Sequence, residues 1–320
     1  MANKPQKQNK VKASQIFGDY IVMLIAPCIV SVMYYGTRAA WVVLVSILSA
    51  VICDMAASLI LRKNFSFRDT SNVFIGVAIA MMMPAGVPFY VPAVASAAAV
   101  LTAKIPFGGS HKAPFVPAAA GFAIASVCFK EQVFNYTEST ADKLLGAQSL
   151  GSLLANGNSV QLNLGNTFDI LVGNISGPMG TGCGILMLVC CCYLFVRRKS
   201  ALLATAGFIG ACVVYAMLFP RINASVFSSI VLELSAGSLL FGAVFLITDP
   251  ATLPKGGISR VIYGAVCGII CMMMRAVGTY EETVCFAILF TNGFSPVIEA
   301  VLNYFGSLSL TKGKGALKNE

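Results

Sequence analysis

The sequence predicts an all-α polytopic membrane protein with about ten transmembrane helices in a five-plus-five inverted repeat and with both termini in the cytoplasm. Three observations lead to this prediction. Of the 320 residues, 57% are hydrophobic and only 11% are charged. The mean hydropathy is +0.81, and apolar runs long enough to cross a bilayer recur along the chain. The remaining residues are too scattered to build a separate soluble domain.

Ten apolar segments account for the expected spans. They are residues 16–36, 40–61, 70–84, 90–104, 113–129, 178–196, 200–219, 226–248, 258–275 and 281–305. The third and fourth contain Pro or closely spaced Gly, so we expect them to be kinked or to cross only partly. This division predicts a cytoplasmic basic tail (1–15), a first five-helix membrane repeat (16–129), an extracytoplasmic loop (130–177), a second five-helix membrane repeat (178–306) and a cytoplasmic tail (307–320).

The basic residues predict the orientation. With the N-terminus inside, 17 of the 22 Lys and Arg residues fall in cytoplasmic segments or at their edges, and 5 fall outside. Positively charged loops remain on the cytoplasmic side of a membrane. The net charge of +9 does not indicate a nucleic-acid partner, because no stretch combines basic and aromatic residues as nucleic-acid binders do.

Two segments repeat each other without gaps at an offset of 166 residues, IGVAIAMMMPAGVP from Ile75 and FGAVFLITDPATLP from Phe241. The matched pairs are Gly76 with Gly242, Pro84 with Pro250, Ala85 with Ala251, and Pro88 with Pro254. The segments belong to spans three and eight, and an odd number of spans per unit inverts the second copy. Such breaks free backbone groups that protein, water or a ligand must satisfy. They therefore predict a route for ions or a pocket for a cofactor, unless they simply end a helix at proline.

Few ionisable residues lie in the expected spans. Asp54 lies in span two, Glu233 in span eight and Glu299 near the end of span ten. An ionisable group within a membrane span is a functional candidate, so Glu233 is expected to serve ion passage, to make an interhelical hydrogen bond, or to lie nearer the membrane interface. His111 is expected to be a solvated loop residue. Most of the 11 cysteines lie in apolar runs, which favours packing; an iron–sulfur ligand set would need a partner.

Several motifs together resemble one known family. LLFGAVFLITDPATLPKGG and the later RAVGTYEETVCFAILFTNGFSPVIE are similar to the C-terminal half of RnfD, a membrane component of Rnf complexes, and of NqrB, its counterpart in the sodium-pumping NADH:quinone reductase. The segment from Gly177 to Thr181, followed by an apolar helix ending in RRK, resembles the family's glycine-rich approach to span six. FGG at 107–109, followed by Pro114-Phe115 and Pro117-Ala118, resembles its fifth-span motif.

The resemblance implies a function. Rnf complexes of the prokaryotic cell membrane pass electrons between ferredoxin and NAD through flavins and iron–sulfur centres, and couple this transfer to export of Na⁺ or H⁺. The protein would therefore work with other membrane and peripheral subunits and would not be catalytic alone. Glu233, Thr248 and Asp249 of the second repeat are the candidate ion-pathway residues.

The resemblance also implies two flavin sites, and this chain departs from both. The family attaches FMN to a threonine hydroxyl outside the membrane, and the attachment motif falls on Asp142, Gly146, Ala147 and Gln148. Gln148 has no hydroxyl for a phosphoester. Attachment at Ser149 or at another hydroxyl such as Thr181, noncovalent FMN, and no flavin all remain open.

The second site, for a flavin such as riboflavin, would lie by Gly108 and Gly109. Ala113 and Val116 stand there in place of the family's asparagines, and neither can hydrogen-bond a flavin ring. Two other functions therefore stay open: an inverted-repeat secondary transporter or channel, and a flavin-free structural subunit of a redox complex.

Overall fold

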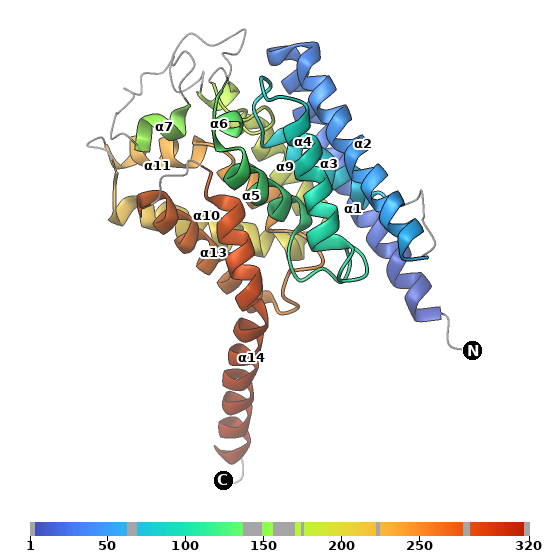
Figure 1. Ribbon diagram of the computed structural model, residues 1–320. Coiled ribbons are helices and arrows are strands. Elements are labelled where there is room, and N and C mark those ends of the chain that lie inside the picture. The colour runs from blue at the N-terminus through green and yellow to red at the C-terminus, as the bar shows by residue number, and fades with distance from the viewer. Residues whose placement is uncertain are drawn as a thin grey trace.

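The computed structural model describes residues 4–62, 69–136, 149–155, 170–173, 176–221, 225–277 and 282–316, with the side chains of 4–16, 152–153, 155 and 302–316 left out. The described chain is helical (Figure 1). Its elements are α1 (Lys4–Tyr35), α2 (Thr37–Ile60), α3 (Ser71–Met81), α4 (Tyr90–Ala99), η1 (Val100–Lys104), α5 (Pro117–Cys128), α6 (Lys130–Val133), α7 (Leu150–Ala155), α9 (Gly184–Arg197), α10 (Lys199–Leu218), α11 (Val226–Ser235), α12 (Leu239–Phe241), η2 (Gly242–Leu246), α13 (Gly257–Val277) and α14 (Val284–Ala316). The short elements η1 and η2 are π-helical.

Among these residues, five helices are long and apolar enough to cross a membrane. They are Phe17–Tyr35, Thr37–Ile60, Lys199–Leu218, Gly257–Val277 and Val284–Val301. A sixth span would be the pair Val226–Ser235 and Leu239–Leu246, which bends by 70° at its break; we call this pair span eight. The prediction of an all-helical polytopic membrane protein is confirmed at this level.

The other four predicted spans are shorter apolar helices: Ser71–Met81, Tyr90–Lys104, Pro117–Cys128 and Gly184–Arg197. Helices of 11 to 15 residues rise only about 16–22 Å, less than the roughly 30 Å of a hydrocarbon core. Proline and glycine at the ends explain the short lengths, because the PAGVP loop follows α3 and Pro117 starts α5. Spans three to six are therefore all short helices, and the partial crossing expected of spans three and four stays a prediction.

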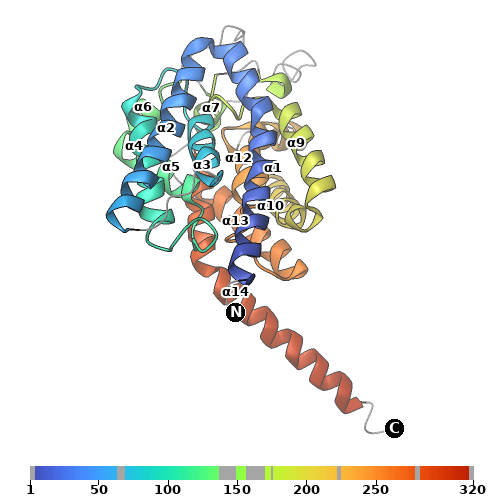
Figure 2. The same cartoon turned by 90° about the vertical axis from the view of Figure 1, so that its right-hand side faces the viewer.

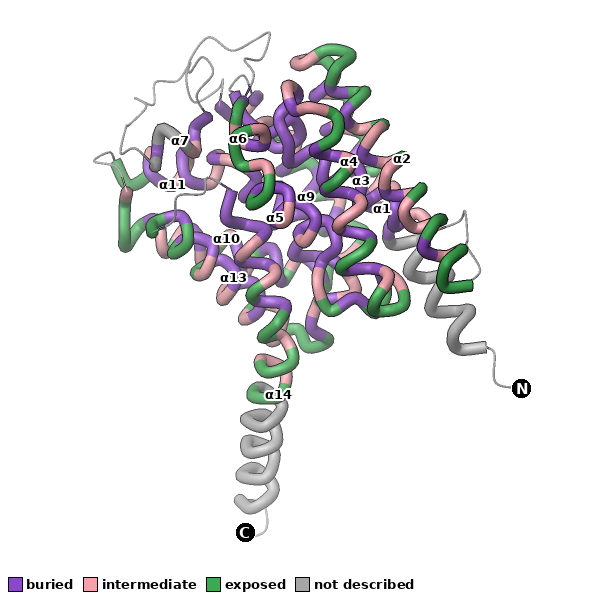
Figure 3. Tube along the Cα trace, viewed as in Figure 1, coloured by how far each residue is buried: buried purple, intermediate pink, exposed green. Residues whose placement is uncertain are grey.

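The outer surface is apolar, as a lipid-facing surface must be. Trp41, Leu48, Ile52 and Leu59 on α2 are 49–72% exposed, and only 17% of the apolar window of α2 is buried. Figure 3 shows this outward face in green and pink, with buried residues gathered in the centre. An apolar face of this extent would be unfavourable in water.

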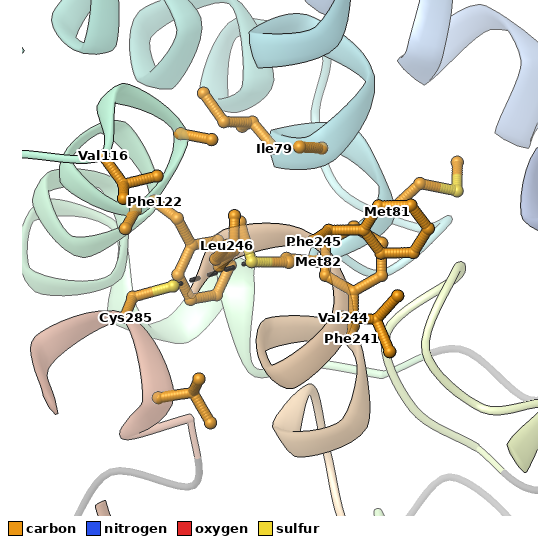
Figure 4. Packing of buried hydrophobic residues seen from close by; sticks show 14 of the residues in the cluster. Ile79, Met81, Met82, Val116, Phe122, Phe241, Val244, Phe245, Leu246 and Cys285 are labelled. Atoms are coloured by element: carbon orange, nitrogen blue, oxygen red, sulfur yellow. Dashed lines mark hydrogen bonds between the residues drawn. The ribbon is translucent and has the colours of Figure 1, made fainter. Parts of the chain in front are cut away.

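The core is built around the two halves of the sequence repeat. Every residue of η2 and nearly every residue of α3 is buried. Figure 4 shows Met81 and Met82, at the end of α3, beside Phe241, Phe245 and Leu246 of span eight. The two segments that align at an offset of 166 residues therefore meet in the middle of the molecule.

Helices α10 and α13 pack with their backbones close together. Gly207 of α10 faces the Val261 carbonyl, and Gly264 of α13 faces the Ala204 carbonyl; a Cβ at either glycine would overlap the opposing backbone. Small residues of this kind allow close helix pairs in membranes. Helix α10 is also bonded to η2 of span eight, because the Thr205 hydroxyl donates to the Ala243 carbonyl at 2.8 Å.

The start of α1 and the end of α14 lie at the same end of the molecule (Figures 1 and 2), and α6 and α7 lie at the opposite end. This arrangement is the one that an even number of crossings produces. The placement of both termini on the cytoplasmic side of the membrane stays a prediction from the distribution of basic residues.

Candidate functional site

The break after α3 is closed by backbone hydrogen bonds. The amides of Met179 and Gly180 donate to the carbonyls of Met83 and Met81 at 3.0 and 2.8 Å. The Ser31 hydroxyl donates to the Met179 carbonyl at 2.8 Å. The glycine-rich segment before α9 therefore satisfies the free carbonyls of the broken helix. Only glycine fits at position 180, because a Cβ there would overlap the Met81 side chain.

The break in span eight is closed by charged side chains. Arg275 donates through Nη1 to the Glu233 carbonyl at 2.9 Å and through Nη2 to the Ala236 carbonyl at 2.7 Å. Both carboxylate oxygens of Glu282 accept from the Ser238 amide, at 2.9 and 2.8 Å. Gly237 lies between them at φ +60°, where a Cβ would overlap Glu282. The backbone of the Ala-Gly-Ser break is thus hydrogen-bonded to Arg275 and Glu282, and the glycine leaves room for the Glu282 carboxylate.

Glu233, the predicted membrane carboxylate, is buried with a side-chain exposure of 3%. Arg221 holds it in a two-pronged ion pair, Nε to Oε1 at 2.5 Å and Nη2 to Oε2 at 2.6 Å. Arg275 Nη1 lies 3.6 Å from Oε2. Planar two-pronged pairing fixes both groups. The Glu233 carboxylate is thus hydrogen-bonded to the loop between α10 and α11, and it contacts α13 only through the ion pair with Arg275. The four charges of Arg221, Glu233, Arg275 and Glu282 sum to zero.

Thr248 and Asp249 belong to a second polar cluster, whose hydrogen bonds do not include Glu233. The Tyr20 hydroxyl donates to the Thr248 carbonyl at 2.7 Å and lies 3.0 Å from its Oγ1. Arg198 Nη1 donates to the Tyr20 hydroxyl at 2.9 Å. Asp249 accepts from the Ala251 amide at 2.9 Å, and burial raises the pKa of its carboxyl to about 6. The three predicted ion-pathway residues are therefore divided between two polar clusters joined by α12 and η2.

A third cluster lies at the end of η1. Lys104 Nζ contacts Asp54 Oδ2 at 3.2 Å, Asp69 Oδ2 at 2.9 Å and Asn72 Oδ1 at 2.5 Å. Its side chain is only 3% exposed. Burial alone would raise the pKa of Asp69, but the Lys104 ammonium and the Ser71 hydrogen bonds lower it below its ordinary value.

Gly108 and Gly109, the predicted second-flavin residues, lie in the loop after this cluster. Their φ angles are +83° and +120°, a conformation in which side chains other than glycine are strained. Gly109 donates to the Lys104 carbonyl at 3.0 Å. Ala113 and Val116, in place of the asparagines, are buried at 1% and 0% exposure. The loop is thus anchored by its own backbone, and these two apolar side chains pack inward.

The residues expected to hold FMN are only partly placed. Asp142, Gly146, Ala147 and Gln148 lie outside the described residues. Ser149 is 4% exposed and directly precedes α7, and Thr181 is 3% exposed, with its hydroxyl 3.3 Å from the Pro178 carbonyl. A phosphoester needs a hydroxyl that the phosphate can reach. The described residues therefore do not fit covalent attachment at Ser149 or Thr181 in this conformation.

Helix α7 connects this loop to span eight. Leu150, Leu154 and Ile170 form a buried apolar cluster with Leu232 and Ala236. Leu232 directly precedes Glu233, and the Ala236 carbonyl binds Arg275. The segment that follows the predicted attachment motif therefore packs on the same half-helix that carries the charged cluster.

The structure also places Glu299, His111 and the cysteines, which the sequence analysis considered. Glu299 accepts from the Lys255 amide at 2.7 Å, and His111 is exposed. Cys212, Cys267, Cys271 and Cys285 are buried, as expected of packing residues. Within the described part of the chain, no group of three or more His, Cys, Asp or Glu side chains is arranged to hold a metal ion. A groove of about 300 Å³ between α1 and α2 is lined by apolar side chains together with Cys28 and Ser31, and none of the predicted flavin or ion-pathway residues lines it.

Sequence reasoning missed Arg275, Glu282 and Lys104 as site residues. Each lies near the edge of an apolar run, where a charge is expected to mark topology. Their partners are 32–50 positions away for Lys104 and 39–44 for the other two. One sequence signal could have indicated Arg275 and Glu282. In RAVGTYEE, an arginine at the end of one span is followed closely by glutamates at the start of the next.

Comparison with known proteins now identifies the family. A family model described as "NQR2, RnfD, RnfE family" matches residues 1–304. The chain belongs to this family. A similar protein from Clostridium ljungdahlii, named as the D component of a "Proton-translocating ferredoxin:NAD(+) oxidoreductase complex", is 25% identical over 93% of each chain.

Two more relatives have similar sequence identities to this chain. The D component of the "Na(+)-translocating ferredoxin:NAD(+) oxidoreductase complex" of Acetobacterium woodii is 24% identical over 93% of this chain and 92% of its own. The D component of the "Ion-translocating oxidoreductase complex" of Halorhodospira halophila is 25% identical over 83% of each. Relatives of similar identity thus carry names with different ions, so membership does not fix the ion.

Proposed function

We propose that this protein is the RnfD-type membrane subunit of an Rnf complex that couples electron transfer between ferredoxin and NAD to translocation of Na⁺ or H⁺. The observation that carries the proposal is the family match over residues 1–304 of the 320. The broken helix of span eight and the short helix α3, which ends before Pro84, contribute to one buried core. Discontinuous helices of this kind form the binding sites of many transporters, which supports the proposal. Its partners would be the other membrane and peripheral subunits, in the cell membrane of a prokaryote.

The inverted five-plus-five architecture with ten crossings is part of this proposal. Besides the sequence repeat, a structural correspondence supports it. The first broken helix begins at Ser71, beside the buried Lys104 at the end of the following helix. In the second copy, Ser238 lies beside the buried Arg275, near the end of α13, and its paired carboxylate Glu282. In each copy, a buried basic residue and carboxylates thus meet where the inner half-helix begins.

The ion-pathway role of Glu233, Thr248 and Asp249 is proposed on their burial. Glu233 and Asp249 are each 2% exposed and Thr248 is 0% exposed. Buried ionisable groups in or next to the spans of membrane proteins generally mark ion routes or fixed ion pairs. A charge moved against the membrane potential costs about 2.3 kcal/mol per 100 mV, which a redox reaction elsewhere in the complex would supply.

A second candidate function, a flavin-free structural or transport subunit, is favoured by one specific observation. The hydroxyls of Ser149 and Thr181 and the side chains of Ala113 and Val116 are all buried, and Gln148 replaces the hydroxyl of the attachment motif.

One experiment separates the two candidates. The protein is purified with its native neighbouring subunits and denatured in acid, then assayed for in-gel flavin fluorescence and for an added FMN mass. Flavin on a peptide within residues 130–182 supports the first function. Release of free flavin supports noncovalent binding within the complex. If the native complex carries no flavin at all, the electron-transfer role is refuted, and a transport or structural role takes its place.

A further inference from the structure

The break in span eight exposes backbone groups of opposite polarity. The C-terminal end of α11 presents free carbonyls with partial negative charge, and the start of α12 presents free amides with partial positive charge. In this structure the chain supplies a counter-ion to each. Arg275 binds the carbonyls of Glu233 and Ala236, and Glu282 binds the amide of Ser238.

Arg275 lies where a small cation would be expected. Its guanidinium is surrounded by the two carbonyl oxygens at 2.9 and 2.7 Å and by Glu233 Oε2 at 3.6 Å. Carbonyls at the C-terminal ends of broken half-helices coordinate Na⁺ in membrane transporters. A set of oxygen donors that includes one carboxylate suits a hard cation.

The guanidinium does not complete the polar contacts of this site. Arg275 Nε and Ser229 Oγ are both buried without a hydrogen-bond partner among the described residues. Ser229 lies one helical turn before Glu233 on α11, so both side chains share one face. Unsatisfied buried polar atoms in a native protein generally mark a water or an ion. The Ser229 hydroxyl oxygen is thus a buried group that a cation or a water would satisfy, whereas the Arg275 Nε–H is a donor that only an acceptor such as water would satisfy.

We propose that the Glu233 and Ala236 carbonyls and the Glu233 carboxylate form a monovalent-cation site that the Arg275 guanidinium fills as a tethered cation. This inference deepens the proposed function and rests on it for its role in translocation. Charge balance favours the exchange. The four charged side chains sum to zero, so withdrawal of Arg275 leaves one net negative charge, which one monovalent cation restores.

The test is cation binding to the full-length protein, purified with its native neighbours. Arg275→Ala empties the site and leaves Glu233 in place. Arg38→Ala is a matched control, because Arg38 also donates to two carbonyls, those of Ala85 and Gly86 at 3.0 and 2.9 Å, at the end of the other broken helix. Thermal unfolding is compared in NaCl, in low-millimolar guanidinium chloride, and in N-methylglucamine chloride of equal ionic strength.

We expect Na⁺ or guanidinium to raise the unfolding temperature of R275A by about 3 °C over N-methylglucamine, since a ligand stabilises the state that binds it. Wild type and R38A should not respond, and Glu233→Gln added to R275A should abolish the response. The proposal is overturned if R275A responds to neither cation, or if wild type and R38A respond equally.

If R275A does not fold, Arg275→Gln decides. Its amide can still donate to a carbonyl but carries no charge, so the same response to Na⁺ is expected, and its absence overturns the site. The readout needs neither flavin nor electron transfer. A responsive variant in a flavin-free complex would therefore support the cation site while refuting the redox function.

Discussion

Lys104 offers a direct measure of how much a buried ion cluster stabilises this fold. Its ammonium is shared by Asp54 Oδ2 at 3.2 Å and Asp69 Oδ2 at 2.9 Å. The side-chain exposures are 3% for Lys104, 13% for Asp54 and 31% for Asp69. Lys104→Met keeps most of the aliphatic volume, removes the charge, and leaves two carboxylates facing each other without a cation.

The size of the effect follows from these exposures. Removing one partner of a buried ion pair costs about 3–5 kcal/mol, because the other charge stays buried and uncompensated. Asp69 is nearly one-third exposed, so water screens part of its charge, and we expect the lower end, about 3 kcal/mol. At about 2 °C per kcal/mol for a chain of this size, the unfolding temperature should fall by about 6 °C.

The assay is thermal unfolding of the purified protein in detergent, with Lys112→Met as the control. Lys112 lies in the neighbouring loop and is exposed, so its loss should change the unfolding temperature little. The double variant K104M/D54N should recover part of the loss, since contacting charges give non-additive effects. A K104M protein that unfolds within about 1 °C of K112M would refute the reasoning, as would strict additivity with D54N.

Two further outcomes follow from the geometry. Burial raises the pKa of Asp249 from 3.8 to about 6, so the stability of the wild-type protein should fall as pH rises from about 4 to about 6 and stay level above that. The Asp249→Asn side chain can still accept from the Ala251 amide but does not ionise, so this variant should lack the pH step and be more stable at pH 8 by up to about 3 kcal/mol. Equal pH profiles of stability for the two proteins would contradict this. On α10, Gly207→Ala should destabilise the protein by about 2 kcal/mol or more, because the added Cβ overlaps the Val261 carbonyl. Gly210→Ala is the control, because a Cβ there has no neighbour within 4 Å, and it should be neutral or slightly stabilising. Equal unfolding temperatures for the two variants would show that α10 and α13 do not pack as described.

Hydropathy located the helices well and their lengths less well. Each of the ten apolar segments contains a helix, because burial of apolar side chains and internal backbone pairing both require one in a membrane. Four of the helices are shorter than their apolar segments suggested. Apolar composition does not distinguish a helical residue from a buried loop residue, and loops such as Met82–Val87 are almost entirely buried within the protein.

The candidate site was less accessible from sequence. The apolar run around Glu233 predicts a position within a span, and its side chain is buried. The proline repeat predicts a break at Pro250–Pro254, whereas span eight is broken earlier, between Ser235 and Leu239. The partners were not predicted, because Arg275 and Glu282 approach the break from segments about 40 positions away. A residue near the end of a span carries the same local sequence signal whether it faces lipid headgroups or a buried carboxylate. Only the packing of these segments against α11 decides between them.

The two broken helices differ in a way that bears on which of them is suited to an ion. At the end of α3, the carbonyls of Met81 and Met83 are paired with backbone amides, which are neutral and fixed in place by the following helix. At the end of α11, the same kind of carbonyl is paired with a charged, long and rotatable side chain. A backbone amide cannot leave without unfolding its segment, whereas an arginine can leave by changing rotamers and can be replaced by another cation at equal charge. Because α7 packs on Leu232 of the same half-helix, a displacement of α7 would act on this arginine site. That difference is why we place the cation site in span eight.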